Sequence, residues 1–393
     1  MRLCSTYELQ PGMRIARDIC DDRLELLIAA GLVLEERMIE RLIELEVDDV
    51  YIHEPGTEDI VPQDDMISDK TRRRTHKLLK RTFDDLTSLA DLSECANEDV
   101  ITILQYDDRF ANAVRVQSFN DVVHSTVDDL FTHRVEVFDT PVVKRYLDRT
   151  YEHSLNTAIL SIMLGRAFYY PPEKLVALGT AAMLHDMGKL VFPELANKPY
   201  RDLSLEEMKR IRLHPAAGAA LLSRSGGHTE LEQTIIRQHH EQQDGRGYPM
   251  KLTGDNLAPL ESRPIRPREI VRYAEIVAVA NAFDNLINGD LMVEPMSPAK
   301  AMEALVRGAG TLYNRAVVSK ALEIINVYPV GSIVEIRLGN MLVETGARGV
   351  VRHSGASGTS RPEILLLWDR HGQRMTPRVV DLNKFPAVEV DLI

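Results

Sequence analysis

The sequence contains few of the features that mark secreted or membrane-spanning proteins. Only three cysteines occur in 393 residues and none forms a Cys-x-x-Cys pair, so neither a disulfide framework nor a thiolate zinc site is expected. The longest apolar run, Leu26 to Leu34, contains Gly31 and is far shorter than the roughly 20 residues that span a bilayer. No apolar segment with a cleavage site follows Arg2, so no signal peptide is predicted. These absences predict a cytoplasmic protein with no membrane span.

Positive charge is also in deficit. The chain has 47 Lys and Arg against 59 Asp and Glu, for a net charge of -12, which argues against a nucleic acid polymer or an anionic lipid surface as partner. A local cationic site for a small anion stays compatible with this balance. The 44% hydrophobic and 27% charged content is ordinary for a globular protein, and the length predicts two or three domains.

The hydrophobic pattern changes three times along the chain. Residues 1–64 alternate short apolar runs with turn residues and include one helical stretch, Glu35 to Leu45, which predicts a small α+β module that ends in a linker over residues 54–69. Residues 65–140 form a weakly marked helical connecting region. Helical periodicity dominates residues 141–327, and short β-branched runs predict a β tail over residues 328–393.

The central region has room for five to seven helices. Ser204 with Glu207 and Thr229 with Glu232 have the spacing of capping boxes, and Ser297-Pro298 is typical of a helix start. The expected fold class is therefore mainly α, with an all-helical domain between a small α+β module and a β tail.

Histidine and aspartate gather in this helical region. Five of the twelve histidines lie there in settings that suit chemistry, and an imidazole and carboxylate set without thiolate favours a hydrolytic site for first-row divalent metals. Each residue alone has an ordinary explanation as a surface or hydrogen-bonded core side chain. Two adjacent histidines and an aspartate in an apolar helix are costly to bury without partners, so the coincidence favours a site. The candidates are His153, His185, Asp186, His214, His239, His240 and Asp284.

Such residues could hold two ions a few ångströms apart, which would clamp a phosphodiester and lower the pKa of a water between them. Asp186, directly after His185, could bridge the two ions while its neighbour binds one. Lys189 lies one helical turn beyond His185 if the helix continues. It could contact a phosphate oxygen or assist the leaving group, so Asp186 and Lys189 are the candidate catalytic residues.

Two motifs resemble those of the HD-GYP phosphodiesterases. They are His185-Asp186-Met187-Gly188-Lys189 and His239-His240-Glu241-Gln242-Gln243-Asp244-Gly245-Arg246-Gly247-Tyr248-Pro249. The order of the candidate ligands resembles that of the family over roughly residues 140–325. The segments Leu9 to Met13 and Val50 to Ile52 are similar to a small domain often found ahead of HD-GYP domains in bacterial proteins.

The resemblance implies a bacterial enzyme that hydrolyses cyclic di-GMP to pGpG and, in some members, on to GMP. It implies two divalent transition-metal ions, Fe or Mn. One ion would be bound by His153, His185, Asp186 and Asp284, and the other by His214, His239 and His240, with Asp186 bridging. The loop from Asp244 to Pro249 would lie near the mouth of the site, with Asp244 and Arg246 as substrate-binding candidates beside Lys189. Diguanylate cyclase (GGDEF) domains and a second copy of the chain are the partners considered.

The sequence departs from the family pattern at two places. Arg149 stands where members with a third metal have a glutamate, so two metals are expected. An Arg-Pro-Tyr-Arg-like run that supplies cations to the phosphates is replaced by Asn285 to Val293, so Lys189 or Arg246 would have to bind the phosphates. Arg263, Arg266, Arg268 and Arg272 form either a lid or a solvated loop.

Three functions therefore stay open. The first is an active cyclic di-GMP phosphodiesterase, favoured because the full ligand set and Lys189 have a clear chemical purpose. The second is a metal-containing sensor or adaptor that binds a cyclic dinucleotide or a cyclase domain without turnover. The third is a hydrolase of another cyclic dinucleotide or of a nucleotide monophosphate.

Overall fold

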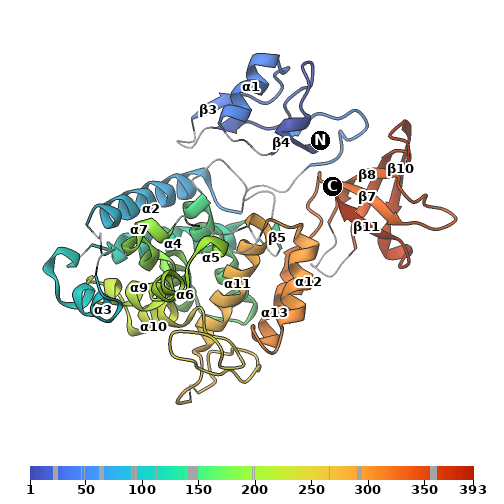
Figure 1. Ribbon diagram of the computed structural model, residues 1–393. Coiled ribbons are helices and arrows are strands. Elements are labelled where there is room, and N and C mark those ends of the chain that lie inside the picture. The colour runs from blue at the N-terminus through green and yellow to red at the C-terminus, as the bar shows by residue number, and fades with distance from the viewer. Residues whose placement is uncertain are drawn as a thin grey trace.

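The computed structural model describes residues 1–393 apart from 21–24, 46, 48, 62–65, 90–91, 93–94, 112, 134, 136, 140–148, 197, 199, 265, 290–293 and 355–360. Figure 1 shows most helices gathered in one body, with the N-terminal module and the C-terminal sheet beside it. This arrangement confirms the mainly α fold class. Among the described residues, no helix is both long and apolar enough to cross a membrane.

The N-terminal module combines two small sheets with one helix. Strand β1 (Arg2–Ser5) pairs with β4 (Asp49–Ile52), and β2 (Ile19–Cys20) pairs with β3 (Leu26–Ile28), both antiparallel. Helix α1 (Glu36–Glu44) buries Ile39 and Leu42 in the core of this module. The sequence does not predict β1, because its buried side chains are Arg2 and Cys4 rather than an apolar pair.

The connecting helices share one core with the central domain. They are α2 (Asp69–Leu89), α3 (Asn97–Tyr106) and α4 (Val116–Thr132). Leu79 of α2 and Val123 of α4 belong to the same cluster of buried side chains as Ile162 of α5. Strand β5 (Phe138–Asp139) also pairs with β6 (Ile325–Asn326) at the far end of the central domain. The connecting region is therefore held by long-range contacts.

The central domain has nine α-helices in its described part, of which seven run for nine residues or more. They are α5 (Arg149–Ala167), α6 (Pro172–Leu184), α7 (Pro193–Ala196), α8 (Leu205–Ile211), α9 (His214–Ser223), α10 (Glu230–Gln238), α11 (Arg272–Asn288), α12 (Pro298–Gly308) and α13 (Arg315–Ile324). Both capping boxes form, at the starts of α8 and α10. Pro298 begins α12 as expected, although the Ser297 side chain makes no capping hydrogen bond.

The C-terminal residues form a five-stranded antiparallel sheet in the order β10-β9-β8-β7-β11. Its strands are β7 (Ile333–Leu338), β8 (Arg348–His353), β9 (Glu363–Trp368), β10 (Arg374–Asp381) and β11 (Glu389–Leu392). The sequence predicts the first four strands. It misses β11, which buries only Val390 fully and closes the sheet against β7.

Residues 54–61 of the segment predicted as a linker pack against this sheet, and its described residues Met66 and Ile67 lie in the core of the helical body. Asp59 pairs with Arg352 at 2.6 Å, and Glu54 pairs with Arg374. Ile60 is 1% exposed and lies in a cluster with Val330 and other side chains of the sheet. Turns and ion pairs hold these residues in place. The segment therefore has no helical or strand periodicity, but it is not a free linker.

Candidate metal centre

Four elements and two turns bring most of the candidate ligands together. His153 lies on α5, His185 and Asp186 follow the end of α6, and His214 begins α9. His239 and His240 follow the end of α10. Two groups of side chains have ligand atoms close enough to hold an ion, and Asp186 belongs to both. They are Asp186, His214, His239 and His240, and His153, His185 and Asp186.

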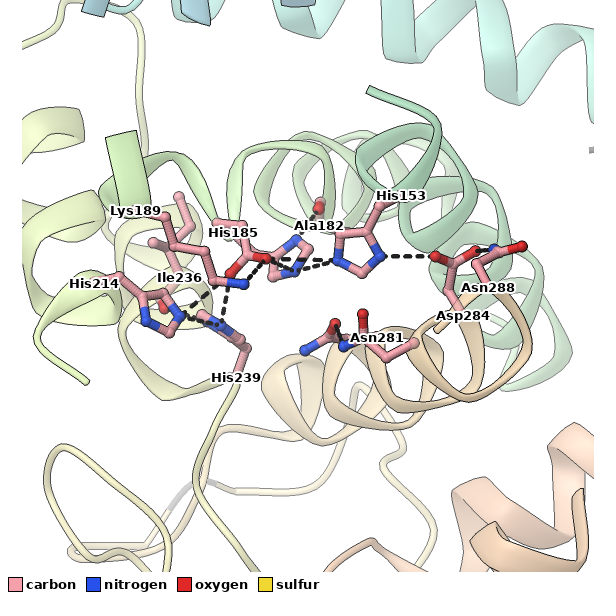
Figure 2. Close-up of polar contacts among 12 residues, drawn as sticks. His153, Ala182, His185, Lys189, His214, Ile236, His239, Asn281, Asp284 and Asn288 are labelled. Carbon is pink, nitrogen blue, oxygen red and sulfur yellow. Dashed lines mark hydrogen bonds and ion pairs between the residues drawn. The ribbon is translucent and has the colours of Figure 1, made fainter. Parts of the chain in front are cut away.

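Backbone carbonyls fix three of the rings in one tautomer. The Nδ1 atoms of His185, His214 and His239 lie 2.7, 2.8 and 2.7 Å from backbone oxygens. A carbonyl oxygen only accepts, so each Nδ1 carries the proton and donates. The Nε2 atom of each neutral ring is therefore left with a lone pair. Figure 2 shows the rings of His185, His214 and His239 gathered around the Asp186 carboxylate.

These lone pairs face one another. Nε2 of His214 lies 3.3 Å from Nε2 of His239, and Oδ1 of Asp186 lies 3.2 Å from Nε2 of His214. That Oδ1 atom is buried and accepts no hydrogen bond of good geometry. Lone pairs that face each other repel unless a cation lies among them. The donor set of ring nitrogens and a carboxylate therefore fits a divalent metal.

The protonation states agree with this fit. Burial lowers the pKa of His185 to about 4, and it holds the pKa values of His239 and His240 well below the usual range. Burial alone would raise the pKa of Asp186, but Lys189 and the surrounding rings keep it well below its usual value. Neutral imidazoles around an ionised carboxylate are the forms that bind metal.

His153 differs from the other rings. Burial would lower its pKa, but hydrogen bonding with Asp186 and Asp284 outweighs that effect and raises the pKa to about 9. The position beside His153 thus favours a positive charge, which either a proton or a metal ion can supply.

Asp284 lies behind His153 rather than inside either group. Its Oδ2 is 2.7 Å from His153 Nδ1, and its Oδ1 accepts hydrogen bonds from the side chains of Asn156 (2.9 Å) and Asn288 (2.8 Å). Both carboxylate oxygens are thus occupied. A carboxylate in this place orients a ligand histidine and raises its basicity, so the direct ligand role expected for Asp284 stays a prediction.

Lys189 does not lie on a continuation of α6. That helix ends at Leu184, and a 3-10 helix (Met187–Val191) follows Asp186, so the condition for placing Lys189 one α-helical turn beyond His185 is not met. The tighter turn places Lys189 Nζ 2.5 Å from Asp186 Oδ2 with 35% of its side chain exposed. The ammonium group thus lies at the edge of the cluster.

The loop after His240 is folded around its own buried polar groups. Glu241 is 3% exposed, and its carboxylate accepts hydrogen bonds from the backbone N–H groups of Met250 (2.6 Å) and Leu252 (2.8 Å). The Tyr248 ring stacks on His240, with centroids 4.8 Å apart and an 18° angle between the planes. Glu241 and Tyr248 belong to the motif from His239 to Pro249, but their roles could not be predicted from the sequence.

The two substrate-binding candidates on this loop lie further out. Asp244 accepts a hydrogen bond from the backbone N–H of Arg246, and their side chains are 3.7 Å apart. The Arg246 side chain is 86% exposed. The structure therefore does not bring Arg246 into the cluster.

Three of the four arginines predicted to form a lid or a solvated loop are engaged elsewhere. Arg263 pairs with Asp255, Arg266 lies 3.6 Å from Glu269, and Arg272 donates to two backbone carbonyls. These three fit the solvated loop better than a lid. Asp290 to Val293, part of the run that replaces the basic family motif, and the side chain of Arg149 lie outside the described residues.

Comparison with known proteins places this geometry in a family context. Residues 140–317 match the HD domain family. The cyclic di-GMP phosphodiesterase PA4108 of Pseudomonas aeruginosa is 25% identical over 280 residues, which cover 71% of this chain and 62% of that protein. The 3'3'-cGAMP-specific phosphodiesterase 2 of Vibrio cholerae is 30% identical over 145 residues, which cover 36% of this chain and 25% of that protein.

The matched part is less than two thirds of each relative's length. A solved structure titled as an HDG"Y"P protein, Bd1817 from Bdellovibrio bacteriovorus, is 19% identical, covers 81% of this chain and 97% of that one, and has a TM-score of 0.41. That score is too low to carry an argument, so the sequence matches support the assignment. Residues 140–317 are therefore similar to the HD domain family, and the resemblance of the chain to the HD-GYP phosphodiesterases is confirmed.

Proposed function

We propose that this chain is a metal-dependent phosphodiesterase that hydrolyses a cyclic dinucleotide, with cyclic di-GMP as the first substrate to test and pGpG as its product. One observation supports this most strongly. Two groups of ligand atoms share Asp186. In the group that contains His214, His239 and His240, the unprotonated Nε2 atoms of His214 and His239 face each other at 3.3 Å.

His153, His185 and Asp186 would hold one ion, with Asp284 beside His153. His214, His239 and His240 would hold the other, with Asp186 shared. When bound, two divalent ions such as Fe or Mn supply positive charge that lowers the pKa of water and offsets charge on phosphate oxygens.

The protein's own groups would orient the metal ligands and supply a proton to the substrate. Three backbone carbonyls hold the rings of His185, His214 and His239 in place, so the ligand geometry is fixed before substrate arrives. Lys189 carries a proton at Nζ close to Asp186, from where it could bond a phosphate oxygen or protonate the leaving oxygen. Asp244 and Arg246 would contact substrate only from the outer part of the loop.

The names of the relatives support the substrate class and leave its exact member open. One relative is named for cyclic di-GMP and another for 3'3'-cGAMP, so a different cyclic dinucleotide is the second candidate. The ion pair between Lys189 and Asp186 would favour a sensor or adaptor if it persists once metal and substrate are bound.

The test combines elemental analysis of anaerobically purified full chain with assays of cyclic di-GMP and 3'3'-cGAMP loss. Asp186→Ala is the site variant, and Asp108→Ala is the matched control because that side chain is 98% exposed and belongs to neither ligand group. About two metal ions per chain, with hydrolysis lost only in Asp186→Ala, would support the proposal. Metal without turnover of either nucleotide would indicate a sensor, and a chain that retains no metal would contradict the site.

A further inference from the structure

Arg212 lies at the rim of the metal centre, a place the sequence analysis does not identify. It follows the last residue of α8, is exposed, and stands two residues before His214. Its guanidinium carbon lies 5.4 Å from the centre of the Tyr248 ring, which in turn stacks on His240 at 4.8 Å. Tyr248 thus links an exposed cation to a candidate metal ligand.

Arg212 differs from its cationic neighbours in having no acidic partner. Lys189 pairs with Asp186, Arg246 lies 3.7 Å from Asp244, and Arg263 pairs with Asp255. Within the described part of the chain, no carboxylate oxygen lies within 4.0 Å of the Arg212 guanidinium. The positive charge at this rim is therefore available to an anion.

The position of Arg212 suits a phosphate. A cation–π contact with a ring leaves the N–H donors of a guanidinium available, and those donors match two phosphate oxygens. A cyclic dinucleotide has two phosphodiester groups in one ring, and only one of them can react in the metal centre at a time. The other lies outside the cluster and needs a cation, which the missing basic run after Asp284 does not provide.

We propose that Arg212, positioned by Tyr248, binds the phosphodiester that is not being hydrolysed. This inference rests on the proposed function and adds a substrate contact to it. The competing explanation is a purely structural one. In it, the contact between Arg212 and Tyr248 stabilises only the packing of the connection between α8 and α9 against the loop after His240. The two explanations differ in what they predict for a substrate with a single phosphodiester.

The experiment compares full-length wild type, Arg212→Ala and Arg212→Lys on cyclic di-GMP and on bis(p-nitrophenyl) phosphate. Arg370→Ala is the charge-matched control, because Arg370 is 59% exposed and pairs with Glu344 near the C-terminal sheet. Arg212→Ala is expected to raise KM for cyclic di-GMP about tenfold with kcat within about twofold, the size of one charged hydrogen-bonding contact at a surface. Arg212→Lys should recover part of that loss, since it keeps the charge but not the planar fork.

The single phosphodiester gives the decisive comparison. Its kcat/KM should stay within about twofold of wild type in Arg212→Ala, because it has no second phosphate to bind. An equal loss on both substrates, or no change in KM for cyclic di-GMP, would overturn the inference and leave the proposed function standing. A wild-type chain that hydrolyses bis(p-nitrophenyl) phosphate but not cyclic di-GMP would overturn both.

Discussion

At the scale of single residues, the Asp186 carboxylate organises the charge of the site. It lies between 3.2 and 3.7 Å from a ring nitrogen of each of four histidines and 2.5 Å from Lys189. Backbone carbonyls hold the rings of His185, His214 and His239 with their N–H groups turned away from it, whereas the Nδ1 atom of His153 is hydrogen-bonded to Asp284. The carboxylate is thus surrounded by lone pairs on one side and by one ammonium on the other, which explains why a cation is favoured there.

Replacement of Asp284 by asparagine tests its position behind His153. The variant Asp284→Asn keeps the shape but removes the negative charge that faces His153 Nδ1 at 2.7 Å. We expect metal affinity to fall about 10–100-fold at the group formed by His153, His185 and Asp186, and to stay unchanged at the other group. The reason is that a less basic imidazole binds metal less well. Competition with a chelator measures this, and Asp381→Asn on β10 serves as control. Complete loss of one ion would instead make Asp284 a direct ligand, and unchanged affinity would contradict any role for it.

A second residue gives a pH-dependent prediction. Burial holds the pKa of Glu275 above its usual range, although Gln243 donates a hydrogen bond to it at 2.8 Å. The raised pKa means that the folded state prefers the neutral acid, so stability is lost as pH rises from the unfolded-state pKa through the folded-state pKa. Glu275→Gln keeps an oxygen acceptor and cannot ionise. We therefore expect urea unfolding to show the variant stabilised relative to wild type at about pH 8 but not at about pH 4. An equal change in the free energy of unfolding at both pH values would contradict this explanation.

At the scale of elements, the turn that carries His185 and Asp186 packs directly on α9. A Cβ atom on Gly188 would lie 2.0 Å from the backbone oxygen of His214 and 2.6 Å from the backbone nitrogen of Gly218. Two segments that supply ligands to different groups thus touch through their backbones. This contact sets the spacing between the two parts of the cluster.

Gly188→Ala should therefore separate these segments. We expect about 3 kcal/mol or more lost from the free energy of unfolding, because backbone atoms cannot yield as a side chain can. Gly218→Ala is the matched control, since its Cβ would meet the Ile236 side chain at 3.0 Å, Gly188 N at 3.4 Å and the Met187 side chain at 3.7 Å, with no contact under 3.0 Å. That variant should change stability by less than about 1 kcal/mol. Chemical denaturation of both variants measures these losses. A loss of less than about 1 kcal/mol in Gly188→Ala would show that the turn can move away from α9.

At the scale of the whole molecule, the first sixty residues are joined to the segment from Val330 to the C-terminus. The N-terminal amino group donates to the backbone oxygen of Ile60 at 3.1 Å, and Leu3 N–H donates to the backbone oxygen of Gly331 at 2.7 Å. Ile60 lies in a cluster with Val330 and strand side chains. The two ends of the chain (Figure 1) are thus connected through contacts outside the helical domain.

Ile60→Ala should loosen this connection. We expect a loss of about 2–4 kcal/mol for a buried isoleucine cut to alanine, seen as faster amide hydrogen exchange in β8 and β9 with α11 unchanged. The neighbouring Val61→Ala is the control, because Val61 is 70% exposed and should have little effect. Faster exchange throughout α11 would mean that the chain ends and the helical domain unfold as one unit.

Much of the fold and most of the cluster could be predicted from the sequence because their signals are local. Capping boxes, helical periodicity and alternating strands need only a few neighbouring residues, and they predict the helices around His214 and His240. The missed strand β1 has no alternating apolar pattern of its own, and β11 alternates only over the four residues Glu389–Leu392. Long-range partners supply their burial instead.

The sequence by itself determined the residue types and order of the metal centre, since a His-Asp turn and a His-His turn each carry their chemistry in adjacent residues. Only the tertiary structure decided how those side chains are used. It placed Asp284 behind His153, paired Lys189 with Asp186, left Arg246 in solvent and set Arg212 over Tyr248. The physical reason is that the direction of a side chain and the charges around it depend on which helices pack together, and spacing along the chain does not specify that packing.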